Sequence, residues 1–242
     1  MKAERKTFSI LGDSYSTYKN YIPNDYEAWY MDEGPCAPND VSCVEQTWWY
    51  MFCKEKQLTL LQNCSYSGSP VCNTWYDGMD ASELSFIKRM ERELVPTQEH
   101  MPDFLIVFGG TNDYGHGDAP LGSFEDRTPD TFYGACHYLF SGLVRKYLGK
   151  PIVIMTPLHR INELEIPDMK MPGDYGDLKT YTNIIREVAE FYSLPVLDLF
   201  ATSGLQPAIK EIQETYIPDG LHPNDKGNEV IAHKLRMFLE SL

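Results

Sequence analysis

Short apolar runs alternate along the chain with longer stretches in which apolar residues recur every three or four positions. Five of these runs, each bounded by Gly, Pro or Asp, predict β-strands at residues 7–11, 58–64, 103–109, 151–156 and 195–199. They are short, and most of them have apolar residues on both faces of the strand. Such strands are typical of a parallel sheet that is covered by helices on both faces.

The stretches between the strands have the period of amphipathic helices. They predict helices at residues 44–57, 81–94, 131–148, 175–192 and 224–239. In the last helix Ile231, Leu235 and Phe238 form an apolar stripe, and Asn224 stands where an N-cap is expected. Because strands and helices alternate without a linker-like segment, the pattern predicts one α/β domain over residues 1–242 with a mostly parallel five-stranded sheet.

Three irregular segments are longer than the usual connection between elements. They cover residues 17–42, 115–130 and 158–173. The first belongs to an aromatic-rich insertion at about residues 17–45. Long loops in a compact domain often carry function, so we expect these segments to lie near the site.

The net charge of the chain argues against two classes of binding partner, nucleic acids and anionic membranes. The sequence has 21 Lys and Arg against 35 Asp and Glu, a net charge of −14, which repels nucleic acids and anionic membrane surfaces. The apolar run at residues 104–108 is far shorter than the roughly 18–20 residues of a membrane span. We therefore expect neither nucleic acid nor membrane as a partner, and the oligomeric state stays open.

The first residues carry no visible export signal, because a polar stretch is followed at once by a short apolar run. This predicts a cytoplasmic protein, or an exported one if a leader has been removed. The six cysteines include no CxxC pair, which excludes zinc-ribbon and thioredoxin motifs. Cys36 and Cys43 lie in one polar loop, where a local disulfide is sterically conceivable in an exported protein.

The residues that can do chemistry follow three of the predicted strands and precede the last helix. They are Ser14 in Gly-Asp-Ser, Gly68 in Ser-Gly-Ser, Asn112 in Gly-Thr-Asn-Asp, and Asp219 and His222 in Asp-Gly-Leu-His. Ligands of an open parallel sheet bind at the carboxyl ends of its strands. A hydroxyl, an imidazole, a carboxylate and amide donors at one edge are the parts of acyl-transfer catalysis.

Each of these residues has a chemical role in that interpretation. Ser14 is the nucleophile, His222 the base that takes its proton, and Asp219 the carboxylate that orients the imidazole. The backbone amides of Ser14 and Gly68 and the side-chain amide of Asn112 are the expected oxyanion donors. The neighbouring Asp13 and Asp113 are expected to brace turns.

These blocks together resemble the GDSL-type esterases and lipases, also called SGNH hydrolases, over nearly the whole chain. Gly12-Asp13-Ser14-Tyr15 resembles the first block of that family, and Gly68, Asn112 and the Asp219/His222 pair resemble later ones. The resemblance implies a flavodoxin-like three-layer α/β/α sandwich. It also implies ester hydrolysis through an acyl-enzyme, without a metal or an organic cofactor.

The sequence departs from the family pattern in two places. Tyr15 stands where a leucine usually follows the serine, and the insertion at 17–45 is longer than in compact members. Both departures bear on the substrate cleft and leave the chemistry unchanged. The candidate cleft residues are Tyr15, Tyr21, Trp29, Tyr30, Tyr114 and His116.

The sequence therefore predicts a serine hydrolase that acts on a small-molecule or carbohydrate ester. Flat aromatic faces near the serine favour a short-chain, acetyl or carbohydrate-linked ester. Two alternatives stay open: a lysophospholipase or thioesterase for longer acyl chains, and a non-catalytic carbohydrate-binding protein on the same fold. The second alternative gives no chemical reason to keep both His222 and Asp219.

Overall fold

We describe the chain from a computed structural model, which describes residues 5–32, 38–76, 79–80, 82–97, 101–170 and 172–242. Within this part the central sheet has five strands in the order β2-β1-β5-β6-β7, and every pair is parallel. The strands are β1 Thr7–Gly12, β2 Thr59–Asn63, β5 Phe104–Phe108, β6 Ile152–Met155 and β7 Val196–Leu197. A short antiparallel pair lies outside this sheet and consists of β3 Trp75–Tyr76 and β4 Met79–Asp80.

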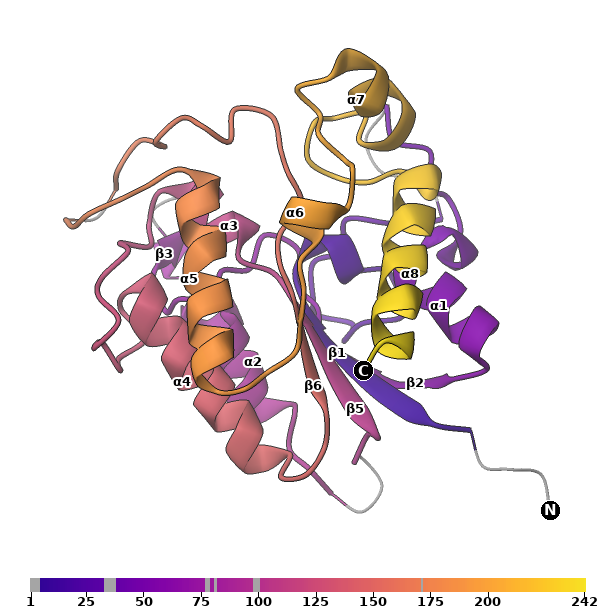
Figure 1. Cartoon of the computed structure of the whole chain (residues 1–242), viewed down its shortest axis with the longest axis horizontal. Coiled ribbons are helices and arrows are strands. Elements are labelled where there is room, and N and C mark those ends of the chain that lie inside the picture. The colour runs from indigo at the N-terminus through magenta and orange to yellow at the C-terminus, as the bar shows by residue number, and fades with distance from the viewer. Residues whose placement is uncertain (1–4, 33–37, 77–78, 81, 98–100, 171) are drawn as a thin grey trace.

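Helices cover the sheet on both faces, with α1 and α8 on one side and α2, α4 and α5 on the other (Figure 1). The helices are α1 Trp48–Lys56, α2 Phe86–Arg92, α3 Thr111–His116, α4 Phe132–Lys146, α5 Leu178–Phe191, α6 Leu199–Thr202, α7 Lys210–Tyr216 and α8 Asp225–Glu240. Three short 3-10 turns accompany them: Ser14–Ser16, Val44–Gln46 and Ser82–Leu84. The predicted three-layer α/β/α architecture is confirmed.

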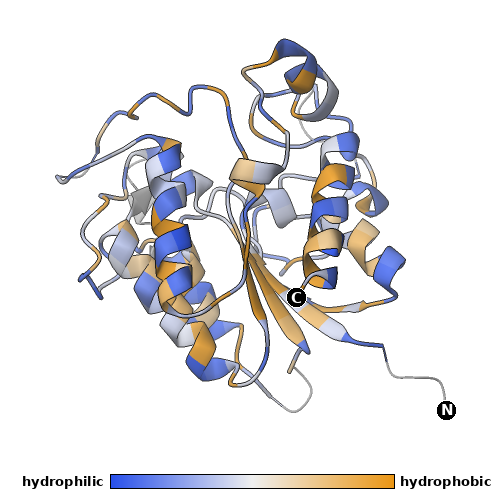
Figure 2. Cartoon of the chain, in the orientation of Figure 1, coloured by the Kyte–Doolittle hydropathy of each residue, from blue (hydrophilic) through white to orange (hydrophobic). Residues whose placement is uncertain are grey.

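Side chains of β1, β5, β6 and β7 enter two separate cores, one on each face of the sheet. Phe8 and Ile10 of β1 pack with α1 and α8, whereas Leu11 packs on the opposite side with α2, α4 and α5. In Figure 2 the strands are apolar along their length, while the helices are polar on the side that faces solvent. Burial on both faces explains why the predicted strands show no alternation of polar and apolar residues.

The predicted elements match the observed ones, with local differences. The helix expected at 81–94 is divided at Ser85 into the 3-10 turn Ser82–Leu84 and α2, and the pair β3 and β4 was not predicted. The helix expected at 44–57 is interrupted at Thr47, whose extended backbone (φ −85°, ψ 145°) separates a 3-10 turn from α1. Short α3, α6 and α7 were not predicted. The expected N-cap of the last helix is present, because the Asn224 side chain accepts a hydrogen bond from the amide of Gly227.

The parallel strands bring the ends of β1, β2 and β5 to one edge of the sheet. In Figure 1 the chain enters β1 at the lower right, so these carboxyl ends lie at the upper end, near α3 and α6. None of the described helices is long and apolar enough to cross a membrane. In the described part of the chain no group of three or more His, Cys, Asp or Glu has a metal-binding arrangement.

Candidate active site

Ser14 begins a single 3-10 turn directly after β1. Its predecessor Asp13 caps the turn, since one carboxylate oxygen accepts a hydrogen bond from the amide of Tyr15 (3.1 Å). A Cβ atom at Gly12 would lie 2.7 Å from Ser65 Oγ and 2.8 Å from Ser16 Oγ, so the turn requires glycine there. The Ser14 side chain is 3% exposed.

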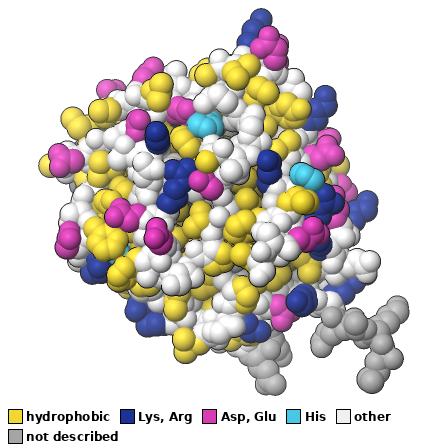
Figure 3. All heavy atoms as spheres, viewed as in Figure 1, with side chains coloured by type: hydrophobic (Ala, Val, Ile, Leu, Met, Phe, Trp, Pro, Cys, Tyr) yellow, Lys and Arg dark blue, Asp and Glu magenta, His cyan; other side chains and the backbone are white. Residues whose placement is uncertain are grey.

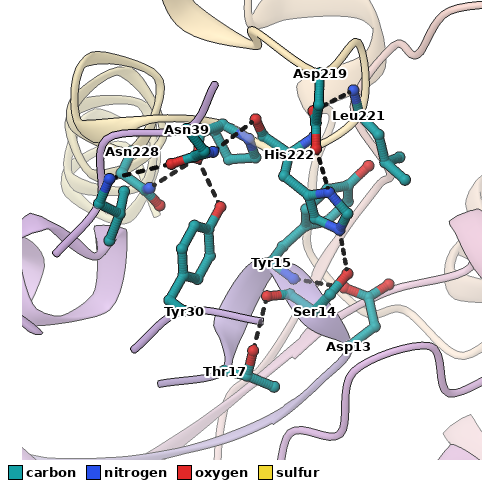
Figure 4. A network of polar contacts seen from close by, with 12 residues as sticks. Asp13, Ser14, Tyr15, Thr17, Tyr30, Asn39, Asp219, Leu221, His222 and Asn228 are labelled. Atoms are coloured by element: carbon teal, nitrogen blue, oxygen red, sulfur yellow. Dashed lines mark hydrogen bonds and ion pairs between the residues drawn. The ribbon is translucent and has the colours of Figure 1, made fainter. Parts of the chain in front are cut away.

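Ser14, His222 and Asp219 form one chain of hydrogen bonds (Figure 4). His222 Nε2 lies 3.0 Å from Ser14 Oγ, and His222 Nδ1 lies 2.7 Å from Asp219 Oδ2. The other Asp219 oxygen accepts from the amides of Leu221 (2.8 Å) and His222 (2.6 Å). Because the carboxylate is fixed by these amides, it can hold the imidazole with Nε2 directed at the serine.

The surroundings of the pair favour a neutral imidazole and an ionised carboxylate. Burial lowers the pKa of His222 below 6.5, although the hydrogen bond and the charge of Asp219 oppose this shift. Burial alone would raise the pKa of Asp219, but the hydrogen bonds from His222 and the backbone lower it below the usual 3.8. These are the protonation states that a general base and its orienting group require.

Gly68 lies in the loop after β2, and Asn112 lies in the first turn of α3, the helix that follows β5. Gly68 has a φ of +80°, which favours glycine, and Asn112 Nδ2 donates to the carbonyl of Ser69 in the same loop as Gly68 (3.1 Å). In the described part of the chain the amides of Ser14 and Gly68 donate to no protein acceptor. Two unused backbone donors and a side-chain amide next to a serine can bind an oxyanion.

Asp13 and Asp113, which were expected to brace turns, both accept backbone hydrogen bonds, and those of Asp113 come from a distant loop. Asp113 accepts hydrogen bonds from the amides of Val71 and Cys72 and so ties α3 to the loop after Gly68. Burial raises the pKa of Asp113 to about 6 and that of Asp13 to about 7. Both side chains are therefore structural: Asp13 caps the 3-10 turn that carries Ser14, and Asp113 anchors the helix α3 that carries Asn112.

Arg89 of α2 is a site residue that the sequence analysis missed. It is fully buried and donates to the carbonyls of Gly12 (2.9 Å) and Cys64 and to Ser69 Oγ (2.6 Å). These acceptors lie at the ends of β1 and β2 and beside Gly68. The only signal in the sequence is a charged residue three positions after Phe86 on an otherwise apolar stripe.

Trp29 of the insertion covers the imidazole of His222. Its ring is half-buried and stacks on His222 with 3.7 Å between the centroids and 17° between the planes. The amide of Trp29 donates to Thr17 Oγ1 (2.9 Å), which links it to the serine turn. Of the six candidate cleft residues, Trp29 is the one that contacts His222 face to face.

The same insertion also holds the backbone that follows His222. Asn39 Nδ2 donates to the carbonyls of His222 (3.3 Å) and Pro223 (3.1 Å), and the Tyr30 hydroxyl donates to Pro223 (2.6 Å). Tyr30 is fully buried for this reason, so the expectation that it is partly exposed in the cleft is wrong.

Tyr15 is also fully buried, which corrects the expectation that it lines a cleft. Its ring packs on Phe108 in the core, with the edge of His222 at a centroid distance of 5.9 Å. An aromatic ring can replace a leucine here because the side chain points into the α1 and α8 core. The Tyr15 ring therefore packs against the His222 imidazole from the side of the core.

The other candidate cleft residues lie in three different places. Tyr21 is 46% exposed but lines a groove of about 500 Å³ with Trp49 and Leu58, at the amino end of β2 and away from Ser14. Tyr114 is buried, and its hydroxyl donates to the carbonyls of Asn162 and Glu165. His116 Nε2 lies 2.9 Å from the carbonyl of Gly68.

Of the two cysteines expected to be able to form a disulfide, the structure describes only Cys43. Cys36 lies outside the described residues, and Cys43 is an exposed free thiol. The remaining described cysteines are free thiols as well, and burial raises the pKa of Cys64 to about 11.

Comparison with known proteins agrees with this geometry. The family profile described as GDSL-like Lipase/Acylhydrolase matches residues 6–168. A solved structure described as a GDSL-like lipase from Bacteroides ovatus ATCC 8483 has 28% identity and a TM-score of 0.76, over 99% of this chain and 100% of that chain.

Two further solved structures are similar over nearly the full length. A GDSL-like lipase from Bacteroides uniformis ATCC 8492 has 29% identity and a TM-score of 0.75, over 99% of this chain and 98% of that one. A protein from Lactobacillus plantarum has 26% identity and a TM-score of 0.73, over 99% and 98% of the two chains. No curated protein matches the sequence.

Proposed function

Because the chain belongs to the GDSL-like lipase/acylhydrolase family and is a serine ester hydrolase, we propose that Ser14, His222 and Asp219 are its catalytic residues. The observation that supports the assignment is the unbroken path of hydrogen bonds from Asp219 through His222 to Ser14, at 2.7 and 3.0 Å. Small-molecule esters are the substrates that the family implies.

The proposed reaction has two halves. As Ser14 Oγ attacks the ester carbonyl carbon, His222 Nε2 takes its proton and then passes it to the departing alcohol. The acyl group remains on Ser14. A water molecule attacks next, His222 takes its proton, and the acid leaves while the proton returns to Ser14 Oγ.

The oxyanion of each tetrahedral intermediate is proposed to bind the amides of Ser14 and Gly68 and the side chain of Asn112. These donors are held by the protein before the substrate arrives, so little reorganisation is needed when charge develops. Loss of one such donor typically costs about 3–4 kcal/mol of transition-state stabilisation.

For the substrate we propose a short-chain or carbohydrate-linked ester. The half-buried ring of Trp29 next to the imidazole offers an aromatic wall, and aromatic walls are common in binding sites for small organic molecules. The serine itself is only 3% exposed, which favours a small group at the acyl carbon.

A second candidate, a lysophospholipase or thioesterase for long acyl chains, is favoured by one observation. The loop after β6 carries the exposed apolar side chains of Ile161, Leu164 and Ile166, and the amide of Ile161 donates to Gly220 in the His222 turn (2.8 Å). Apolar side chains at that place can contact an acyl chain that extends from the serine.

The test is hydrolysis of 4-nitrophenyl esters from acetyl to dodecanoyl by the wild type and by Ser14→Ala, Asp219→Asn and the control Ser241→Ala. We expect Ser14→Ala to be inactive and Asp219→Asn to lose about 10³–10⁴ in kcat, because the imidazole loses its orienting carboxylate. Ser241 is exposed beyond α8, so its variant keeps full activity. A maximum at acetyl supports the short-chain proposal, and one at dodecanoyl supports the second candidate.

Turnover that survives in Ser14→Ala would reject the assignment of the nucleophile. Absence of turnover with every ester, together with no labelling of Ser14 by a fluorophosphonate, would instead favour a non-catalytic binding protein. The labelling reaction needs only an activated serine and does not depend on the choice of ester.

A further inference from the structure

Arg160 lies in the loop after β6, between the turn that carries His222 and the start of α3. Its backbone neighbour Ile161 donates to the carbonyl of Gly220, inside the turn that carries Asp219 and His222 (2.8 Å). Its Nη1 lies 3.3 Å from the carbonyl of Thr111, the residue before Asn112. The segment that carries Arg160 therefore contacts the turn of His222 through its backbone, while the Arg160 side chain reaches the residue that precedes Asn112.

The guanidinium of Arg160 pairs with no carboxylate in the described part of the chain. Its side-chain hydrogen bonds go only to Thr111, at 3.3 Å and 3.4 Å, and its carbon Cζ lies 5.5 Å from the centre of the Tyr114 ring. By contrast, Arg186 pairs with Asp198 and Arg92 with Glu83. The half-buried Arg160 thus keeps its Nε and Nη2 donors unused.

The nearest acid of the same loop is engaged elsewhere. Glu163 accepts from His159 Nδ1 (2.8 Å), from Gln206 Nε2 (3.0 Å) and from the backbone amide of Arg160 (3.1 Å). The Arg160 side chain is therefore not neutralised by the acid three residues after it. Its charge also contributes to the lowered pKa of His222, after burial, which agrees with a position close to the imidazole.

An unpaired guanidinium has a definite chemical preference. Its planar fork of N–H donors matches carboxylate, phosphate and sulfate groups, which it binds through two parallel hydrogen bonds. The chain as a whole carries a charge of −14 and repels anions, so a cation whose segment contacts the His222 turn can hold an anion near that turn.

We propose that Arg160 binds an anionic group of the substrate, so that the natural ester carries a carboxylate, phosphate or sulfate close to the scissile bond. This inference rests on the proposed serine esterase. It narrows the substrate class to acidic esters, for instance acylated acidic sugars or half-esters of dicarboxylic acids.

The experiment compares kcat/KM for matched neutral and anionic esters. One pair, 4-nitrophenyl pentanoate and mono-4-nitrophenyl glutarate, places the anion on the acyl side. A second pair, methyl 4-acetoxybenzoate and 4-acetoxybenzoate, places it on the alcohol side, and each rate is divided by that of spontaneous hydrolysis. The proteins are the wild type, Arg160→Gln, Arg160→Lys and the control Arg145→Gln, which removes an exposed charge on α4.

We expect the wild type to favour the anionic member of at least one pair. In Arg160→Gln that preference falls by about tenfold to a hundredfold, as for the loss of a hydrogen bond to a charged group. Arg160→Lys, which keeps the charge but loses the fork, falls in between. Arg145→Gln keeps the wild-type ratio.

Equal ratios in the wild type and Arg160→Gln, with both proteins folded by circular dichroism, would overturn the inference. That result is distinguishable from failure of the proposed function, because Ser14-dependent turnover of the neutral esters would persist. A fall in all rates with an unchanged ratio would also overturn it, and would make Arg160 a residue that only holds the loop after β6 against Thr111.

Discussion

At the scale of single residues, the proposed mechanism makes the protonation of His222 the acid limit of activity. The imidazole must be neutral to take the proton of Ser14, and burial lowers its pKa below 6.5. Activity therefore persists below pH 6.5 and falls only as the pH passes through the lowered value. We expect the midpoint of the acid limb of kcat/KM, measured with a neutral ester, to lie below 6.5.

The same shift has a consequence for folding that serves as a check. In the unfolded chain His222 takes up a proton near pH 6.5, whereas in the folded protein it does so only at a lower pH. The free energy of unfolding therefore decreases as the pH falls below 6.5. Urea unfolding at each pH separates this loss from the kinetic effect. An acid limb centred at or above 6.5 in a fully folded protein would contradict the lowered pKa.

The sequence indicates which residues can take part in catalysis, but not which residues position them through hydrogen bonds. Ser14, Asp219 and His222 could be named because a hydroxyl, an acid and an imidazole at the expected points carry a chemical signature. Tyr30 was placed in the cleft, yet its hydroxyl donates to Pro223, a partner 193 positions away. A contact over that distance in the chain leaves no local pattern in the sequence.

At the scale of elements, the five strands were predictable because burial on both faces leaves unbroken apolar runs. The short α3 was not, because it starts from Gly110 in a left-handed conformation (φ +104°) and is too brief to show a helical period. The break at Thr47 was hidden for a similar reason, since Val44 and Trp48 fit one continuous apolar stripe.

The contacts of Arg89 join three elements, and we expect its removal to be costly. Arg89→Met leaves the carbonyls of Gly12 and Cys64 and the hydroxyl of Ser69 without their buried donor. Each buried acceptor that loses its hydrogen-bond donor typically destabilises a protein by about 1–3 kcal/mol. Urea unfolding measures the change against Arg145→Met, an exposed control on α4.

A second readout connects this cluster with the site. Because Arg89 holds the loops of Ser14 and Gly68, turnover of Arg89→Met should also fall under conditions where the variant is fully folded. If its unfolding free energy matched that of Arg145→Met, the hydrogen bonds of Arg89 would have no net value for the fold.

At the scale of the whole molecule, the charge of −14 acts against the compact state. Figure 3 shows acidic and basic side chains scattered together over one face, so local pairs soften the repulsion without removing the excess. Screening by salt weakens repulsion between exposed charges more than it weakens buried contacts. We expect the melting temperature to rise by several degrees between about 0.02 and about 0.5 M sodium chloride.

Tetramethylammonium chloride at equal ionic strength is the control for this prediction. If screening is the cause, both salts raise the melting temperature alike, because only ionic strength matters. A rise with one salt alone would point to binding of a particular ion. A constant or falling melting temperature in both would show that attractive surface pairs outweigh the excess negative charge.

The hydrogen bond between Ser14 and His222 joins residues 208 positions apart. During synthesis on the ribosome, Ser14 is made with the first strand, and His222 follows 208 residues later. In the proposed mechanism the nascent chain therefore cannot hydrolyse esters before His222 has been made. A polypeptide that is released before that point carries the proposed nucleophile without the group that activates it.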